Sequence, residues 1–232
     1  VDGVAAANVA CLANGTRAQA GDGLDGSVAS LAFMSDGTLV AGGKFLTAGG
    51  ENIATLSGAS WSAVGQGTDG QVNAVAIDGS AIVIGGTFQS PFPALARFDG
   101  GAWNTLPGGL EARDAAPTVT DLATAQDGVY VVGHFDVAGG VAAANIARWS
   151  GASATALTSP GDAPQGINGE VRALLADSAA DGVLAAGRFL TAGNTLVNNV
   201  ARLANGSWQP VGDPGEPINV LARSPSGDVY AA

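Results

Sequence analysis

The apolar residues of this chain fall into short segments in which they alternate with polar residues. The segment GSVASLAF at 26–33 is one example, and an Asp36-Gly37 pair and a second apolar segment, TLVAGGKF, follow it. Alternation with a period of two indicates half-buried strands, and Asp-Gly supplies the positive φ that tight hairpin turns need. The pattern therefore predicts many short strands joined by tight turns.

This pattern recurs along the chain. AGGKFLTAGG beginning at Ala41 returns as AAGRFLTAGN beginning at Ala185, and VAAANVA at Val4 returns as VAAANIA at Val141. A Gly-x-Phe element ends at Phe45, Phe88, Phe135 and Phe189. The period of about 40–50 residues and the four strand-like segments in each repeat predict the antiparallel blades of a β-propeller.

Five blades are predicted, and together they form one all-β domain over 1–232. The fifth blade combines two strands from the C-terminus with two from the N-terminus, which closes the ring and removes exposed strand edges. The alternative is an excerpt of a longer array, cut at equivalent points. The predicted repeats are 26–65, 70–107, 117–158, 169–212, and 216–232 completed by 1–20.

The order of these segments resembles that of kelch-type propellers: an apolar inner strand, a turn, LVxGG, NxARx and a Trp-bearing outer strand. Gly-Gly-x-Phe followed by Ala-Gly-Gly and Asn-x-Ala-Arg is most similar to repeats of bacterial secreted proteins and fungal cortical polarity-marker proteins. The resemblance covers essentially the whole chain, although the segment at Leu95 lacks the Asn and 16–20 lacks the Trp. It implies the fold and a secreted or cell-surface location. It implies no activity, because propellers host many functions.

Composition sharpens this interpretation. Glycine contributes 36 residues, which is costly in helices, while 47% of residues are hydrophobic and only 12% are charged. The net charge is −11, and Lys44 is the only lysine, so nucleic acid and anionic membrane surfaces are not expected partners. No apolar run is long enough to cross a bilayer.

The single cysteine, Cys11, excludes an internal disulfide. The first residue is Val1 rather than Met, which favours a processed chain or an excerpt of a precursor. With the acidic, lysine-poor composition and the resemblance, this predicts an extracellular or cell-surface protein.

No motif predicts a cofactor or a metal ligand set. His134, the only histidine, occupies the position of Lys44, Thr87 and Arg188 in the other repeats, so we expect a solvated strand end. No G-x-S-x-G accompanies it, and the Gly-Gly pairs lack the Lys and the helix of a phosphate loop. The acidic loops at 21–27 and 65–71 could offer oxygens to Ca²⁺, but they lack the aspartate ladder of known calcium loops and are explained by turns.

Carboxylates on the predicted inner strands are Asp121, Glu170 and Glu216, each at a different register. They form no repeated acidic ring, so no catalytic residue is predicted. A glycan-active enzyme with a carboxylate pair in a channel or cleft remains the alternative. A further series recurs at one strand position, and hydrogen bonds between blades are its expected role: Arg97, Arg148 and Arg202.

The loops predict where a partner binds. Those from second to third strand, and from fourth strand to the next blade, are longer and emerge on one face, with the longest at 107–116 and 159–168. We therefore predict a non-enzymatic binding, adhesion or scaffold module whose partner is a protein or a glycan. A structural segment of a longer repeat array is a further alternative. The candidate ligand-binding residues are Phe92, Leu110, Glu111, Arg113, Asp114, Asp162 and Gln165.

Overall fold

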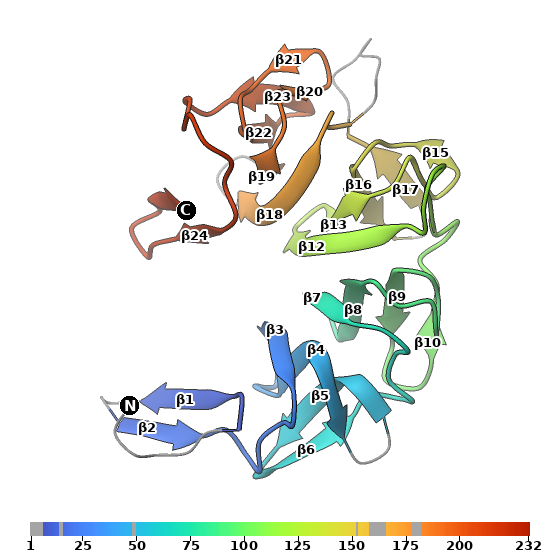
Figure 1. Cartoon of the computed structure of the whole chain (residues 1–232), viewed down its shortest axis with the longest axis vertical. Helices are drawn as coiled ribbons and strands as arrows, with labels where there is room; N and C mark the ends of the chain where they lie inside the picture. The colour runs from blue at the N-terminus through green and yellow to red at the C-terminus, as the bar shows by residue number, and fades with distance from the viewer. Residues whose placement is uncertain (1–6, 14–15, 48–49, 152, 158–165, 178–181) are drawn as a thin grey trace.

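The computed structural model describes residues 7–13, 16–47, 50–151, 153–157, 166–177 and 182–232. Four antiparallel sheets of four strands each are arranged around a common axis, as in a β-propeller (Figure 1). In each sheet the strands pair in sequence order from the innermost to the outermost. The all-β architecture predicted from the repeats is therefore confirmed.

The four sheets are named blades 1 to 4 in chain order. Blade 1 is β3 (Ser27–Phe33), β4 (Leu39–Thr47), β5 (Gly50–Ser57) and β6 (Ser60–Ala63). Blade 2 is β7 (Val72–Asp78), β8 (Ala81–Gly86), β9 (Leu95–Phe98) and β10 (Trp103–Asn104). Blade 3 is β12 (Thr118–Ala125), β13 (Gly128–His134), β16 (Ile146–Ser150) and β17 (Ser153–Ala156). Blade 4 is β18 (Glu170–Asp177), β19 (Gly182–Arg188), β22 (Val200–Ala204) and β23 (Ser207–Pro210).

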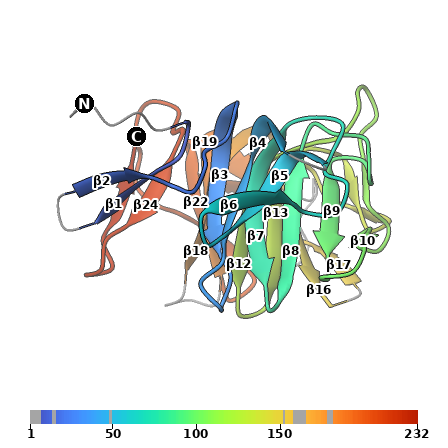
Figure 2. The ribbon, with the colours of Figure 1, turned by 90° about the horizontal axis from the view of Figure 1, so that it is seen from below.

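Figure 2 shows the strands of the blades upright, so the loops gather on two opposite faces. The hairpin face carries the short turns that join first to second and third to fourth strands. The long-loop face carries the other connections, which include small β-structures. These are β11 (Leu110–Glu111) paired with β14 (Val137–Ala138) and β15 (Val141–Ala142), and the pair β20 (Thr191–Ala192) and β21 (Thr195–Leu196).

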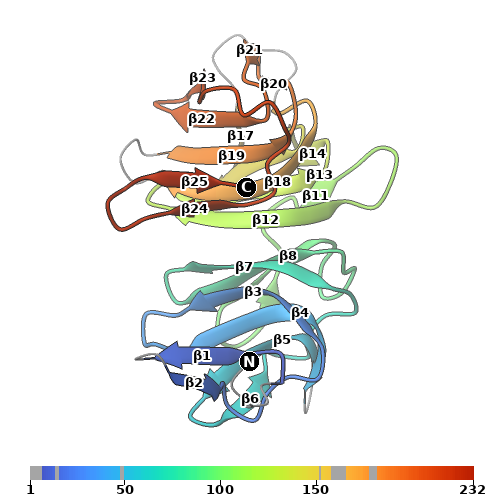
Figure 3. The same ribbon diagram turned by 60° about the vertical axis from the view of Figure 1, so that its left-hand side comes forward.

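Two further hairpins come from the ends of the chain and lie on the same side of the molecule (Figure 3). They are β1 (Ala10–Ala13) with β2 (Thr16–Gln19), and β24 (Leu221–Arg223) with β25 (Val229–Ala231). Within the described residues each hairpin is a separate two-stranded sheet. The predicted fifth blade, in which these hairpins pair with one another, therefore stays a prediction.

The core lies between neighbouring blades. Val83 of blade 2 packs in one buried cluster with Val119 and Val131 of blade 3, and equivalent clusters join blades 1 and 2 and blades 3 and 4. The Gly-Gly pairs belong to this packing, because a Cβ on Gly42 would approach Val72 of blade 2 to 2.6 Å. Close packing at a strand end thus explains these glycines.

The first strands are also joined by polar contacts around the axis. A β-bulge interrupts each of them at the same place, for example between Val119 and Asp121. From the bulge of blade 2, Asn73 donates to the carbonyl of Val119 at 2.8 Å, and from that of blade 3, Thr120 donates to the carbonyl of Val171 at 2.7 Å. The bulges therefore direct side chains toward the next blade.

Candidate functional site

Residues that recur at the same position of several blades serve the fold. The Asn that precedes the third strand residues x-Ala-Arg or x-Ala-Thr adopts positive φ, at 68° in Asn52 and 63° in Asn145, a conformation that Asn tolerates. Its amide group joins a blade to the linker beyond it, since Asn52 donates to the carbonyl of Thr68 at 2.8 Å and Asn145 to that of Ile167 at 2.9 Å. Repetition of such a contact indicates a structural role rather than a ligand.

Three of the four tryptophans also join blades. The indole N–H of Trp61 donates to the carbonyl of Ala20 at 2.9 Å, and that of Trp208 donates to the carbonyl of Leu157 at 3.1 Å. Trp149 lies on a third strand instead of a fourth, yet its indole makes the same kind of contact with the carbonyl of Pro107 at 3.2 Å. All three side chains are buried.

The recurring arginines bind within their own blades, which corrects the expectation of contacts between blades. Arg97 pairs with Asp78 at 3.2 Å, Arg148 with Asp127, and Arg202 with Asp177 at 2.6 Å. In each case the carboxylate lies at the end of the first strand or in its turn, so the arginine crosses the second strand to reach it. These pairs fix three cations on the hairpin face.

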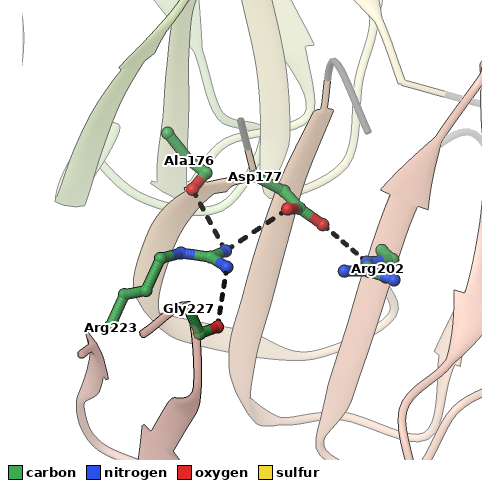
Figure 4. A network of polar contacts seen from close by, with 5 residues as sticks. All are labelled: Ala176, Asp177, Arg202, Arg223 and Gly227. Carbon is green, nitrogen blue, oxygen red and sulfur yellow. Dashed lines mark hydrogen bonds and ion pairs between the residues drawn. The ribbon is translucent and has the colours of Figure 1, made fainter. Parts of the chain in front are cut away.

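One of these carboxylates also joins two sheets. The side chain of Asp177 is fully buried and pairs with Arg202 of its own blade and, at 3.3 Å, with Arg223 of β24 (Figure 4). Arg223 donates in addition to the carbonyls of Ala176 and Gly227. This network attaches the C-terminal hairpin to blade 4.

The carboxylates of the inner strands are engaged as well. Both oxygens of Asp121 accept backbone N–H bonds, from Leu122 at 2.8 Å and from Leu174 of blade 4 at 2.7 Å. Burial raises the pKa of Asp121 to about 6, although these two hydrogen bonds act in the opposite direction. Glu170 pairs with Arg172 at 2.7 Å, which lowers the pKa of Glu170.

The acidic loops hold their neighbours through backbone contacts. Asp25 accepts from the N–H of Leu46 at 2.6 Å, and one oxygen of Asp69 accepts from Gln89 and Ser90 at 2.7 and 2.9 Å. Among the described residues, no group of three or more His, Cys, Asp or Glu side chains is placed to hold a metal ion. These aspartates anchor loops of the long-loop face.

The predicted ligand-binding residues have different environments. Glu111, Arg113 and Asp114 are exposed on the long-loop face, where Asp114 lies 2.8 Å from the ring of His134. That hydrogen bond lowers the pKa of Asp114. His134 is half exposed, as expected for a solvated strand end.

Of the other predicted ligand-binding residues, two are largely covered by the protein and two lie outside the described residues. Leu110 is only 7% exposed because β11 pairs with β14 and turns its side chain into the core between blades 2 and 3. Phe92 is half-buried and packs against the core between blades 1 and 2. Asp162 and Gln165 lie outside the described residues.

A groove that the sequence did not indicate opens between blades 1 and 2, with a volume of about 590 Å³. Its walls are the end of β4, the start of β5, the linker to blade 2 and the turn at Ser90-Pro91, which contains a cis peptide bond. Trp103 lies along it as the one partly exposed tryptophan. Its indole N–H is buried and has no acceptor among the described residues.

Blade 2 departs from the repeat at this groove. Ala94 replaces the motif Asn and still has a φ of 59°, and the cis Ser90-Pro91 turn stands where blades 3 and 4 have a small β-hairpin. The missing Asn at Leu95 was the only signal in the sequence. The orphaned indole depends on the fold of the linker and could not be foreseen.

Known structures share this architecture. Similar folds occur in a structure described as YCF48 bound to D1 peptide (TM-score 0.51, 16% identity, 88% of this chain and 59% of that one) and in the computationally designed Ika8 protein (0.56, 15%, 90% and 57%). Another is the extracellular domain of a hybrid two-component system of B. thetaiotaomicron (0.57, 14%, 88% and 25%). This chain thus spans less than two thirds of each of these proteins.

These identities show a shared propeller fold and nothing finer. No protein-family model matches the chain, and no curated protein matches it. In the part of the chain that the structure describes, no helix is long and apolar enough to cross a membrane.

Proposed function

We propose that this chain is a non-enzymatic binding, adhesion or scaffold module of a secreted or cell-surface protein, with blades of the kelch type. Its partner is a protein or a glycan, which binds at the long-loop face. One observation carries the proposal: contacts repeated in several blades account for the recurring Asn, Trp and Arg residues, while Glu111, Arg113 and Asp114, which do not recur, are exposed on that face.

The similar structures support a binding role. One is described as bound to a peptide, and another is an extracellular domain. They share only the fold with this chain, so the partner and the location are inferred here from the loops, the composition and the sequence resemblance. The exposed residues Glu111, Arg113 and Asp114 are the proposed contacts on blade 3.

A glycan-hydrolysing reaction has less support. Such a reaction needs one carboxyl group to donate a proton and a second to act as nucleophile or base. Asp121 has both oxygens occupied by backbone N–H groups, and Glu170 is paired with Arg172. Asp121 thus has both oxygens engaged, and the ion pair with Arg172 lowers the pKa of Glu170, which disfavours it as a proton donor.

Arrays of peptides and glycans test this function with the labelled chain as the probe. We expect the triple variant Glu111→Ala/Arg113→Ala/Asp114→Ala to weaken binding to the recognised spots at least tenfold. The variant Ser60→Ala/Ser80→Ala changes exposed residues of the hairpin face and serves as the control. Equal binding by the triple variant, or loss in the control alone, would contradict the proposed face.

A further inference from the structure

The groove between blades 1 and 2 combines an aromatic side chain with carboxylates. Trp103 lies against Phe98, with ring centroids 5.1 Å apart, and is partly exposed. Leu46, which also lines the groove, is 58% exposed. A partly solvated indole beside an exposed leucine is an unusual surface for a blade junction, because the other three tryptophans are buried and hydrogen-bonded.

The charged side chains along this groove are both acidic. Glu51 and Asp69 line it, and none of its described lining residues is cationic. Asp69 is fixed because its Oδ1 accepts two backbone N–H bonds from the Ser90 turn, and these bonds lower the pKa of Asp69. Its carboxylate is therefore ionised at neutral pH, and its Oδ2 has no part in those two bonds.

We propose that this groove binds a cationic side chain, arginine or lysine, of a partner peptide. Glu51 and Asp69 supply the countercharge, and the indole of Trp103 offers a face on which a guanidinium or ammonium group is stabilised by cation–π attraction. The groove volume of about 590 Å³ falls within the range of ligand sites. The inference rests on the proposed function as a binding module and names the chemistry of one subsite.

Charge complementarity favours a basic peptide over a neutral glycan. The chain carries 20 acidic and 9 basic residues, so its field attracts cations. Three of its arginines are held in ion pairs with aspartates of their own blades. Lys44 lines an adjoining cavity with Glu51 and Asp69, so the two carboxylates of the groove outnumber the one cation beside them.

Tryptophan indole N–H resonances provide a direct test, because the chain has only four tryptophans. The ¹⁵N-labelled protein is titrated with acetyl-Gly-Arg-Gly-amide, and the signal of Trp103 is identified with the variant Trp103→Phe. We expect that signal to shift and saturate, while those of Trp61, Trp149 and Trp208 stay in place as internal controls. The same peptide with citrulline, a neutral analogue of arginine, should leave all four unchanged.

Two variants with the same change of charge separate the site from the general field. Glu51→Gln should weaken the peptide at least tenfold, whereas Glu216→Gln, at an exposed position away from the groove, should not. Equal shifts with the citrulline peptide, equal effects of both variants, or a shift of Trp103 only with a neutral glucose hexasaccharide would overturn the proposal. Any of these results would leave the array test of the long-loop face standing.

Discussion

Asp121 and Ser30 occupy the same position of the first strand in two blades, and both accept a hydrogen bond from the next first strand. Ser30 accepts from the N–H of Val75 at 3.0 Å, and Asp121 accepts from that of Leu174 at 2.7 Å. A hydroxyl makes this contact without burying a charge, whereas the carboxylate of Asp121 is ionised in a poorly solvated place. Burial therefore raises its pKa to about 6.

This difference predicts a pH dependence of stability. The folded state holds a proton on Asp121 more tightly than the unfolded state does. The stabilisation of the folded state by this proton is therefore fully present below about pH 4 and is lost as the pH rises through 6. Asp121→Ser removes this dependence. The unfolding free energy of the variant minus that of the wild type should therefore be about 2 kcal/mol higher at pH 7 than at pH 4. Urea denaturation at several pH values measures the difference.

The control for this prediction is Ser30→Ala, which removes the equivalent contact without a titrating group. Its loss of stability should be the same at every pH in this range. A parallel pH dependence of Asp121→Ser and the wild type would contradict the assignment to Asp121.

Between the third and fourth strands, each blade places a tryptophan opposite an apolar residue, and only blade 3 carries it on the third strand. Leu203 of β22 lies opposite Trp208 of β23, whereas in blade 3 the order is reversed and Trp149 of β16 lies opposite Ala154 of β17. The indole still donates to a carbonyl of the preceding blade in both cases. The contact is thus preserved although the tryptophan has moved to the neighbouring strand.

Exchanging this pair should be tolerated better than breaking it. Trp149→Leu removes a buried indole and its hydrogen bond, and we expect it to cost about 2–4 kcal/mol of unfolding free energy. Ala154→Trp alone overpacks the site and should cost about 1–3 kcal/mol. The double variant restores the arrangement of blade 4 and should lie within about 1.5 kcal/mol of the wild type by chemical denaturation. Additive losses in the double variant would show that the two orientations are not equivalent.

Strands and turns could be predicted from the sequence because the same signals recur along the chain. These signals are the alternation of apolar and polar residues in the strands and the Asp-Gly pairs in the turns. The candidate site was less accessible to prediction. Leu110 was assigned to an exposed loop, but two residues of that loop pair with β14 and bury the side chain. The sequence shows that arginine recurs at one strand position, but it does not show which residue the side chain binds. The partner aspartates lie two strands away in the same blade. The groove at Trp103 and its indole N–H without an acceptor depend on how the linker and the Ser90 turn fold, which the sequence pattern does not indicate.

At the scale of the whole molecule, the two terminal hairpins contact the ring as halves of a blade do. Asn8 donates to the carbonyl of Leu24 at 2.7 Å, as Asn52 does to that of Thr68, so β1 and β2 lie against blade 1 like third and fourth strands. Arg172 of blade 4 donates to Asn219 at 2.7 Å, so β24 follows β18 like a first strand. Closure of the ring would pair β25 with β1.

The register of β19 and β22 predicts the partners in a closed ring. Leu184 lies opposite Arg202 there, and the equivalent residues of the terminal hairpins are Tyr230 and Cys11, both exposed. Tyr230→Cys should therefore form an intramolecular disulfide with Cys11 under mild oxidation, because directly opposite residues bring their Cβ atoms within reach. Non-reducing electrophoresis and thiol titration at low protein concentration detect it.

Val229→Cys is the matched control, since adjacent residues of a strand face opposite sides and its thiol should stay free. Disulfide-linked dimers in place of the intramolecular bond, or no disulfide at all, would contradict closure at five blades. Those results would favour an open segment of a longer array.

The contacts between blades have a consequence for how such a chain can change in evolution. A repeat that keeps these residues carries its own half of a joint: the Asn amide reaches the linker beyond it, and the bulge side chain reaches the next first strand. An in-frame duplication or deletion of one whole repeat would leave the remaining contacts between blades intact. Each contact is formed by equivalent positions of two consecutive repeats, so any two neighbouring repeats can form it. The number of blades can then vary among descendants while the geometry of each junction is inherited.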